Sequence, residues 1–320
     1  MRRDGLMIDS QTLWDQLATL AGVLQPTYEA LGRYVLQAPI VGADETWWRL
    51  MAKPAAKRWW VWSVTREDAV VYRILDTRSQ HAAREVLAGY TGIVMADGYG
   101  VYDALARAGP GSGITLVHCW AHVRRKFIDA EPHYPEPCRV ALDLIGQLYA
   151  VERAVPTQAT TAGDDDDARA EVLGLRERLR DERSRPIVRE IQAWALAKRA
   201  LPESSLGKAI SYLLGLWPGL THFLDDPRIP LDNNLTERGL RGVVLGRRNH
   251  YGSRSRRGTE VAALFYSLIE SAKLTGVEPK RYLLTATRAA LADRTAVVLP
   301  RDLIAGDGKG VCPPVARVAE

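Results

Sequence analysis

The sequence has few of the residues that build a disulfide framework or a cysteine-rich metal site. Its 320 residues include three cysteines, Cys119, Cys138 and Cys312, which are widely spaced and form no CxxC pair. An odd number of isolated cysteines disfavours both a disulfide scaffold and a zinc ribbon, and is typical of a reducing compartment. We therefore expect a cytoplasmic protein.

Long apolar runs are also missing. No stretch of about 18 apolar residues occurs, which argues against a membrane span. The basic start Met1-Arg2-Arg3 is not followed by a continuous apolar segment, so we expect no signal peptide. The apolar fraction of 47% and the charged fraction of 25% are those of a globular protein. The net charge of +5 and the pI near 9.1 suggest a polyanionic partner.

The order of the predicted elements indicates an α/β fold. Residues 1–38 read as a helical amino-terminal arm, capped by Asp9-Ser10 and interrupted at Pro26; its alternative interpretation is a remnant of a helix-turn-helix. From Ala38 the pattern changes to β-branched and aromatic runs split by short polar turns, which predict three antiparallel strands. Two helix–strand pairs follow up to Trp120. The order βββαβαβ predicts an RNase H-like mixed five-stranded sheet, in which the first and fourth strands are neighbours.

The rest of the chain is predicted to be mainly helical. A basic helix follows Trp120, and three segments between residues 132 and 226 carry a 3.6-residue apolar period without any strand pattern. We therefore divide the core into residues 39–131 and 227–292, separated by an all-helical insertion at 132–226. The acidic run at 164–167 is expected to be solvated, and residues 293–320 to form a flexible tail.

Three carboxylates are candidates for one metal site. Asp97 ends the short buried run Ile93 to Ala96 and is followed at once by glycines, Asp44 lies on the first strand, and Glu237 follows a probable helix start at Asp232-Asn233-Asn234. Carboxylates that converge repel one another unless cations lie between them, and Mg²⁺ prefers oxygen ligands. Two such ions roughly 4 Å apart can clamp both oxygens of an in-line phosphoryl displacement.

Each of these acids also has a purely structural interpretation. In that interpretation Asp97 is a turn residue, Asp44 accepts a hydrogen bond at the end of a strand, and Glu237 is a surface partner of Arg241. Glu45 also competes with Asp44 for its place in the metal site. Asp232 competes with Glu237 for the third position, but its place at the helix start favours a capping or active-site-edge role.

The segment from Arg238 to Thr259 contains no acidic residue and seven arginines. A segment with so many positive charges and no negative charge is typical of a surface that binds DNA phosphates. A second basic group follows the fifth strand, on the helix after Trp120. The predicted DNA-binding residues are Arg124, Arg125, Lys126, Arg238, Arg241, Arg247, Arg248, Arg254, Arg256 and Arg257.

The segment Cys119-Trp120-Ala121-His122 has the spacing of two metal ligands, but a zinc site needs two more, and neither Cys138 nor the other histidines complete it convincingly. We interpret Cys119 as a core residue and His122 as a residue at the edge of the active site. The tryptophans between Trp47 and Trp62 alternate along strands, so we expect them to pack in the sheet.

Several phrases, in order, resemble the transposases of the IS-sixty-six type bacterial insertion sequences. They include ADETWW, VMADGYGVYDAL, HCWAHVRRKF, LPESSLGKAISYLL, LDNNLTERGLRGVVLGRRN and YSLIESAKLTGVEP. The resemblance implies a DDE transposase with two Mg²⁺ or Mn²⁺ ions, and its triad positions fall on Asp44, Asp97 and Glu237. Members usually carry a longer amino-terminal region with helical and zinc-binding parts, and the resemblance implies that this chain begins inside or after it.

The function that the resemblance implies is DNA strand cleavage at an element end followed by transfer of the 3′-OH to target DNA. The expected partners are both DNAs and at least one more copy of the chain, and the expected location is the bacterial cytoplasm near the nucleoid. Two alternatives remain at this point: a metal-dependent nuclease or resolvase of the same fold, and a DNA-binding remnant without catalysis.

Overall fold

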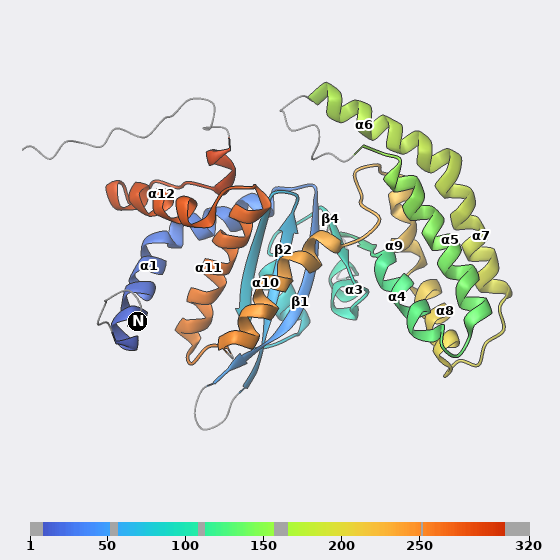
Figure 1. Cartoon of the computed structure of the whole chain (residues 1–320), viewed down its shortest axis with the longest axis horizontal. Helices are drawn as coiled ribbons and strands as arrows, with labels where there is room; N and C mark the ends of the chain where they lie inside the picture. Colours follow the sequence, from blue (N-terminus) through green and yellow to red (C-terminus); the bar gives the residue numbers. More distant parts are fainter. Residues whose placement is uncertain (1–8, 52–56, 108–112, 157–165, 251, 305–320) are drawn as a thin grey trace, which may run out of the picture. The chain divides into compact units, whose positions relative to one another are not determined.

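The computed structural model describes residues 9–51, 57–107, 113–156, 166–250 and 252–304 (Figure 1). The chain forms two compact lobes. The first lobe contains the residues up to Tyr90 and those from Leu235 onward, and the second lobe runs from Thr91 to Asn234.

The strands form a five-stranded mixed sheet in the order β3-β2-β1-β4-β5. β1, β2 and β3 are antiparallel neighbours, whereas β4 and β5 are parallel. This order and the succession βββαβαβ confirm the predicted RNase H-like fold. The elements are β1 (Ile40–Leu50), β2 (Lys57–Arg66), β3 (Ala69–Leu75), α2 (Gln80–Val86), β4 (Ile93–Ala96), α3 (Gly100–Ala106) and β5 (Thr115–His118).

In the first lobe one face of β1, β2 and β3 carries the main core. Trp48, Val61 and Tyr72 of the strands pack against Leu240 and Val243. The helices of this lobe are α1 (Ser10–Val35), α10 (Asn234–His250), α11 (Arg256–Leu274) and α12 (Pro279–Ala292). In Figure 1 α10 and α11 lie beside the three strands.

The outer edge of β3 is covered by serine side chains of α11. The backbone N–H of Val70 donates to Ser271 Oγ at 2.9 Å, and that of Tyr72 donates to Ser267 Oγ at 2.8 Å. An edge strand with unpaired N–H groups invites pairing with another chain, so these contacts protect the sheet.

Two predictions about the ends of the chain are wrong. Pro26 does not interrupt the first helix: α1 continues through it, capped by Asp9, which accepts from the Thr12 N–H at 2.7 Å. Leu24 and Leu31 are fully buried on either side of the proline, and their burial offsets the cost of about 3 kcal/mol for a proline inside a helix.

Residues 293–304, predicted as the start of a flexible tail, are packed. The Tyr282 hydroxyl donates to the Val298 carbonyl at 3.0 Å, and Arg301 donates to the Tyr34 hydroxyl at 2.6 Å. A short 3₁₀ helix follows at Pro300–Leu303. The remaining tail, 305–320, lies outside the described residues.

The second lobe combines β4 and β5 with the helices of the predicted insertion. These are α4 (Trp120–Ala130), α5 (Pro135–Arg153), α6 (Asp166–Leu179), a π-helical turn (Arg180–Ser184), α7 (Arg185–Ala197), α8 (Ser205–Gly215) and α9 (Trp217–Thr221). α4 contacts both α5 and α8, and α5 lies beside α7 (Figure 1). Asp164 and Asp165 of the acidic run lie outside the described residues.

The insertion helices pack directly on the strand ends of their own lobe. α9 approaches β5 so closely that a Cβ on Gly219 would lie 2.4 Å from Cδ2 of His118. The Trp120 indole N–H donates to the Leu220 carbonyl at 2.9 Å. The two compact lobes are divided after Tyr90 and after Asn234, not at the predicted ends of the insertion, 131/132 and 226/227. Those ends of the insertion remain predictions.

Candidate active site

Asp44 lies in a row of residues that crosses the three antiparallel strands. It pairs with Ser63 on β2, which pairs with Tyr72 on β3. Directly opposed residues in antiparallel strands project to the same face, and so does Trp48, four residues further along β1. Because Trp48 and Tyr72 both pack in the core with α10, Asp44 projects to the face that α10 covers.

Local hydrogen bonds fix the backbone around Asp44. Its Oδ1 accepts the N–H of Glu45 at 2.8 Å, and its carbonyl accepts the Ser63 hydroxyl at 3.0 Å. The side chain is half-buried. A carboxylate held in this way is oriented without being removed from solvent.

Glu45, the competing candidate, projects to the opposite face. Its side chain has no exposed area, and it accepts a hydrogen bond of 2.8 Å from Nε of Arg78. The Arg78 guanidinium also lies over the Trp60 ring, 4.9 Å from the ring centroid. A buried carboxylate needs such a partner, so Glu45 serves the fold and Asp44 is the better candidate for the site.

Glu237 lies in the first turn of α10, as predicted. Two contacts fix the direction of this helix. The Tyr72 hydroxyl donates to the Gly239 carbonyl at 2.8 Å, which ties the start of α10 to the row that contains Asp44. Arg247 near the other end donates to Thr46 Oγ1 at 3.1 Å, further along β1. α10 therefore runs in the same direction as β1, with Glu237 at the Asp44 end.

The rotation of α10 also brings Glu237 toward β1. Gly242 faces α11, because a Cβ there would lie 2.5 Å from Oε1 of Glu270. At about 100° per residue, Glu237 is turned about 140° away from Gly242. Since α11 lies over β3, that rotation points Glu237 away from β3. Within the first lobe, Asp44 and Glu237 thus share one face and one level of the sheet.

Asp97 in the second lobe directly follows β4. Ala96 pairs with His118, so Asp97 leaves the sheet at the end of the parallel pair, where α/β proteins place their chemistry. Its Oδ1 accepts the Tyr99 N–H at 2.9 Å, which forms an Asx turn, and Gly98 adopts φ +85°. Asp97 therefore does form the turn that its structural interpretation requires, and its half-buried carboxylate leaves a metal-binding role a prediction.

Cys119 is a buried core residue, as expected. It is 1% exposed, and burial raises the pKa of its thiol to about 11. A buried thiol of this kind is a structural residue rather than a reactive one. Cys119 Sγ instead accepts the Asn233 N–H at 3.2 Å, and the Trp120 N–H donates to the Leu231 carbonyl at 3.1 Å.

These two bonds hold the segment that leads into α10, a connection that no sequence signal indicated. Asp232 in that segment caps the helix start: Oδ1 accepts the Asn234 N–H at 3.1 Å, and Oδ2 accepts the Asn234 side-chain amide at 2.7 Å. His122, in the first turn of α4, is half-buried. A role of His122 and Asp232 at the edge of an active site remains a prediction.

The seven arginines after Glu237 differ in their surroundings. Arg238, Arg241 and Arg248 are exposed and, at spacings of three and seven, form one stripe along α10. Arg256 and Arg257 lie 3.6 and 3.2 Å from the Glu260 carboxylate, whereas Arg254 is exposed in the turn before them.

Arg247 differs from the other arginines because it faces the sheet. Its guanidinium lies 3.7 Å from the Trp47 ring centroid and also donates to the Trp47 carbonyl. Burial, and then the charge of Arg248, lowers its pKa. The other tryptophans bear out the packing prediction in part, since Trp48 and Trp62 are fully buried and Trp47 is 40% exposed.

The basic residues of α4 are exposed in the second lobe. Arg124, Arg125 and Lys126 follow one another on the surface of this helix. Lys126 lies over the Tyr212 ring, with Nζ 5.3 Å from the ring centroid.

Comparison with known proteins identifies the family. A family model described as Transposase IS66 family matches residues 1–261. The chain belongs to the IS66 transposase family. The matched residues contain all five strands, Asp44, Asp97 and Glu237. DDE transposases of this kind are catalytic and use divalent metal ions.

Three curated proteins of Sinorhizobium fredii (strain NBRC 101917 / NGR234) are similar to the chain. It is 32% identical over 312 residues to "Uncharacterized protein y4jD", a match that covers 92% of this chain and 58% of that protein. With "Uncharacterized protein y4hP" it shares 29% identity over 308 residues, or 88% of this chain and 53% of the relative. "Uncharacterized protein y4qI" is 30% identical over 306 residues, with 90% and 54% covered. The chain therefore spans about half the length of these relatives.

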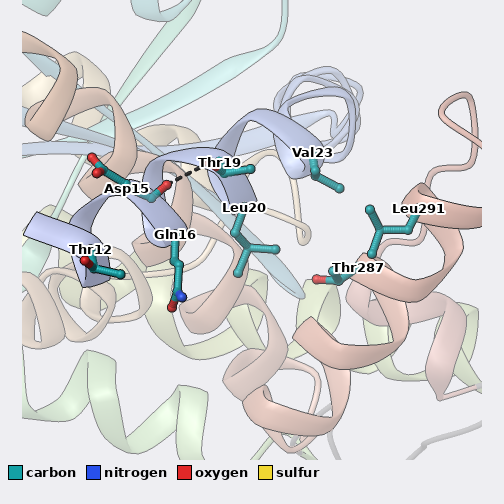
Figure 2. A pocket seen from close by; sticks show the side chains of 8 residues that line it. All are labelled: Thr12, Asp15, Gln16, Thr19, Leu20, Val23, Thr287 and Leu291. Atoms are coloured by element: carbon teal, nitrogen blue, oxygen red, sulfur yellow. Dashed lines mark hydrogen bonds between the residues drawn. The ribbon is translucent and has the colours of Figure 1, made fainter. Parts of the chain in front are cut away.

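Two further features of the described residues bear on function. No described helix is long and apolar enough to cross a membrane. An open groove of about 430 Å³ lies between α1 and α12 (Figure 2). None of its lining residues is adjacent in sequence to Asp44, Asp97 or Glu237. Its one carboxylate is Asp15, so it lacks the acid cluster of a metal site. Its lining residues are Thr12, Asp15, Gln16, Thr19, Leu20, Val23, Thr287 and Leu291.

Proposed function

We propose that the chain is the catalytic core of an IS66 transposase, which cuts DNA at the element ends and joins the 3′-OH to target DNA. In this proposal Asp44, Asp97 and Glu237 hold two Mg²⁺ or Mn²⁺ ions. The observation that supports it most is the position of Asp44 and Glu237 on one face and at one level of the first lobe's strands. In the proposal Asp97, which follows β4 in the second lobe, is the third ligand.

The donor chemistry fits Mg²⁺ or Mn²⁺ better than zinc. The three carboxylates offer hard oxygen ligands and are half-buried, so water and phosphate can reach them. When bound, two such ions would activate water and stabilise the charge on the attacking and leaving oxygens.

The protein residues position the carboxylates before any ion binds. Ser63 and the Glu45 N–H orient Asp44, and the Tyr99 N–H orients Asp97. Tyr72 holds the first turn of α10 and with it Glu237. Such pre-positioning lowers the reorganisation needed when the scissile phosphate arrives.

The exposed stripe of α10 supplies the proposed path for the DNA backbone. Arg238, Arg241 and Arg248 lie on the same helix as Glu237, so phosphates bound along the stripe lead to the proposed catalytic carboxylate. Arg254 and the exposed residues Arg124, Arg125 and Lys126 are proposed to add further phosphate contacts. Because two element ends must be joined in one reaction, we also propose that the chain acts on DNA as a dimer or larger assembly.

Cleavage and joining are tested with the purified chain and labelled duplexes that end in the terminal repeats of its own element. We expect nicking at the element end in Mg²⁺ or Mn²⁺, and joining of pre-cut ends to a target plasmid. Asp44→Asn, Asp97→Asn and Glu237→Gln should abolish both reactions while DNA binding persists. Asp129→Asn, an exposed acid on α4, is the matched control and should retain activity.

Two results would contradict the proposal. Cutting without joining of pre-cut ends would identify a nuclease or resolvase. Binding without cutting in either metal would identify a DNA-binding remnant.

The DNA path is tested by the salt dependence of binding. Replacing Arg238, Arg241 and Arg248 by Gln should lower the slope of log Kd against log salt by about 2 to 3, or about 0.9 per lost phosphate contact. The control removes three exposed cations of the second lobe, Arg183, Arg189 and Lys198, and so makes the same change in net charge. Equal slopes for the two triple variants would contradict a path along α10.

A further inference from the structure

The turn that carries Asp97 is held by the helical insertion of its own lobe. The Tyr212 hydroxyl, on α8, donates to the backbone carbonyl of Asp97. Leu216, at the end of the same helix, packs against the next residue: a Cβ on Gly98 would lie 2.7 Å from Cδ1 of Leu216. Two side chains one helical turn apart thus contact two successive residues of the turn.

These contacts define the peptide that follows Asp97. Gly98 has φ +85°, a conformation open to glycine and rarely to other residues, and the Leu216 methyl groups would have to shift to admit a side chain there. The hydrogen bond from Tyr212 fixes the plane of the Asp97–Gly98 peptide. The Tyr99 N–H, just beyond it, in turn fixes the carboxylate through its 2.9 Å bond to Oδ1.

We propose that Tyr212 is a positioning residue for Asp97, and that the insertion thereby forms part of the catalytic machinery. This inference rests on the proposed function, since it assigns the turn a task only if Asp97 holds a metal ion. Without the Tyr212 hydroxyl the Asp97–Gly98 peptide is free to rotate, which displaces the Asx turn and the carboxylate with it. A displacement of about 1 Å at a reacting centre can cost about 100-fold in rate.

The surroundings of Tyr212 suit this task. The side chain is half-buried, and burial, followed by the charge of Asp97, raises its pKa, so the hydroxyl remains a donor throughout the pH range of an assay. Lys126 lies over its ring at 5.3 Å. Because Lys126 is a proposed phosphate contact, DNA bound on α4 would lie next to the residue that holds Asp97.

The variant Tyr212→Phe removes the hydroxyl and keeps the ring. Tyr282→Phe is the matched control, because the Tyr282 hydroxyl also donates to a backbone carbonyl, that of Val298, at 3.0 Å in the first lobe. Each variant loses one tyrosine–carbonyl hydrogen bond, so a general loss of stability should be similar in both. Leu216→Ala tests the second contact independently.

Two measurements need no DNA. Binding of Mn²⁺ alone, followed by the loss of the free-ion electron paramagnetic resonance signal, should weaken about fivefold in Tyr212→Phe and stay unchanged in Tyr282→Phe. Amide hydrogen exchange of a peptide covering residues 97–102 should accelerate in Tyr212→Phe and Leu216→Ala only. With DNA, the Mg²⁺ concentration for half-maximal cleavage should rise by a similar factor.

Unchanged Mn²⁺ binding and unchanged exchange at residues 97–102 in Tyr212→Phe would overturn the inference. Failure of the proposed function is separable from this result. It would show as wild-type protein and Asp97→Asn that bind Mn²⁺ equally well, whereas the exchange measurement still decides whether Tyr212 holds the turn.

Discussion

The most severe single change outside the proposed site should be at Arg180. Its side chain is 1% exposed, yet it occupies the first position of the π-helical turn between α6 and α7. The guanidinium donates to both carboxylate oxygens of Glu152, at 2.7 and 3.0 Å. It also donates to the carbonyls of Phe223, Asp226 and Ile229 at 2.7, 3.2 and 3.0 Å.

The π-helical turn makes this arrangement possible. Arg176 and Arg185 flank Arg180 at spacings of four and five residues, and donate to the carbonyls of Pro227 and Leu224 at 3.2 and 3.0 Å. In a regular α-helix five residues rotate by about 140°, which would turn Arg185 away, whereas a wider turn brings it back to the same side. Three arginines thus bind the backbone of one connection, from Phe223 to Ile229.

Replacing Arg180 by Met keeps most of the volume and removes all five donors. Three carbonyls then lose a donor, and Glu152 keeps only the ion pair with Arg176 at 3.5 Å. Breaking a buried ion pair from one side costs about 3–5 kcal/mol, and we expect a loss near the lower end of that range. For a lobe of this size such a loss lowers the unfolding temperature by on the order of 10 °C. Thermal and urea unfolding followed by circular dichroism measure the effect.

Arg185→Met is the control for this prediction. Arg185 binds the same connection, but its side chain is 34% exposed and its partner Asp181 is 55% exposed, so the expected loss is about 1 kcal/mol or less. A loss below about 1 kcal/mol for Arg180→Met as well would refute the reasoning, because it would mean that water replaces the five donors without cost.

Two further predictions concern the first lobe's turn and the buried thiol. Gly252→Ala should destabilise the protein by about 2 kcal/mol or more, because Gly252 has φ +115° and a Cβ there would lie 2.0 Å from the Arg49 carbonyl oxygen. The control is Gly22→Ala: Gly22 is exposed inside α1 with open space around it, so this change should stabilise the protein by about 0.5–1 kcal/mol. Equal changes in the free energy of urea unfolding for the two variants would refute the prediction. Cys119 should resist a disulfide reagent at pH 8 in the native state, because its pKa of about 11 keeps the thiol protonated. Its reaction rate should rise only as the pH approaches that value. Rapid reaction of Cys119 at pH 8, mapped by mass spectrometry, would contradict the burial of the thiol.

Much of the fold was predictable because its signals are local. The strand runs alternate or end on glycine, the helices carry a clear apolar period, and Asp9 marks a helix start as expected. Pro26 was misjudged because the local penalty of proline was weighed without the burial of Leu24 and Leu31 around it. The order of residues 293–304 depends on Tyr34 and Tyr282, partners that a local pattern does not indicate.

The carboxylates of the candidate site were named from the sequence, but the residues that hold them in place were not. Glycine and apolar context single out Asp97, and a helix start precedes Glu237. The choice of Asp44 over Glu45 needed the sheet faces and Arg78, which only the register reveals. Likewise, Arg247 reads as one more phosphate contact until its place over Trp47 is seen. Tyr212 and Arg180 bind carbonyls more than 40 residues away, a distance at which sequence spacing carries no information.

The central claim is that Asp44, Asp97 and Glu237 bind the same divalent ions. Crystals of the protein soaked in Mn²⁺, with anomalous diffraction data, test it most directly. The account predicts anomalous peaks about 2.0–2.3 Å from carboxylate oxygens of all three residues. Peaks at Asp232 or Glu45 instead, or Mn²⁺ bound without Glu237, would contradict it.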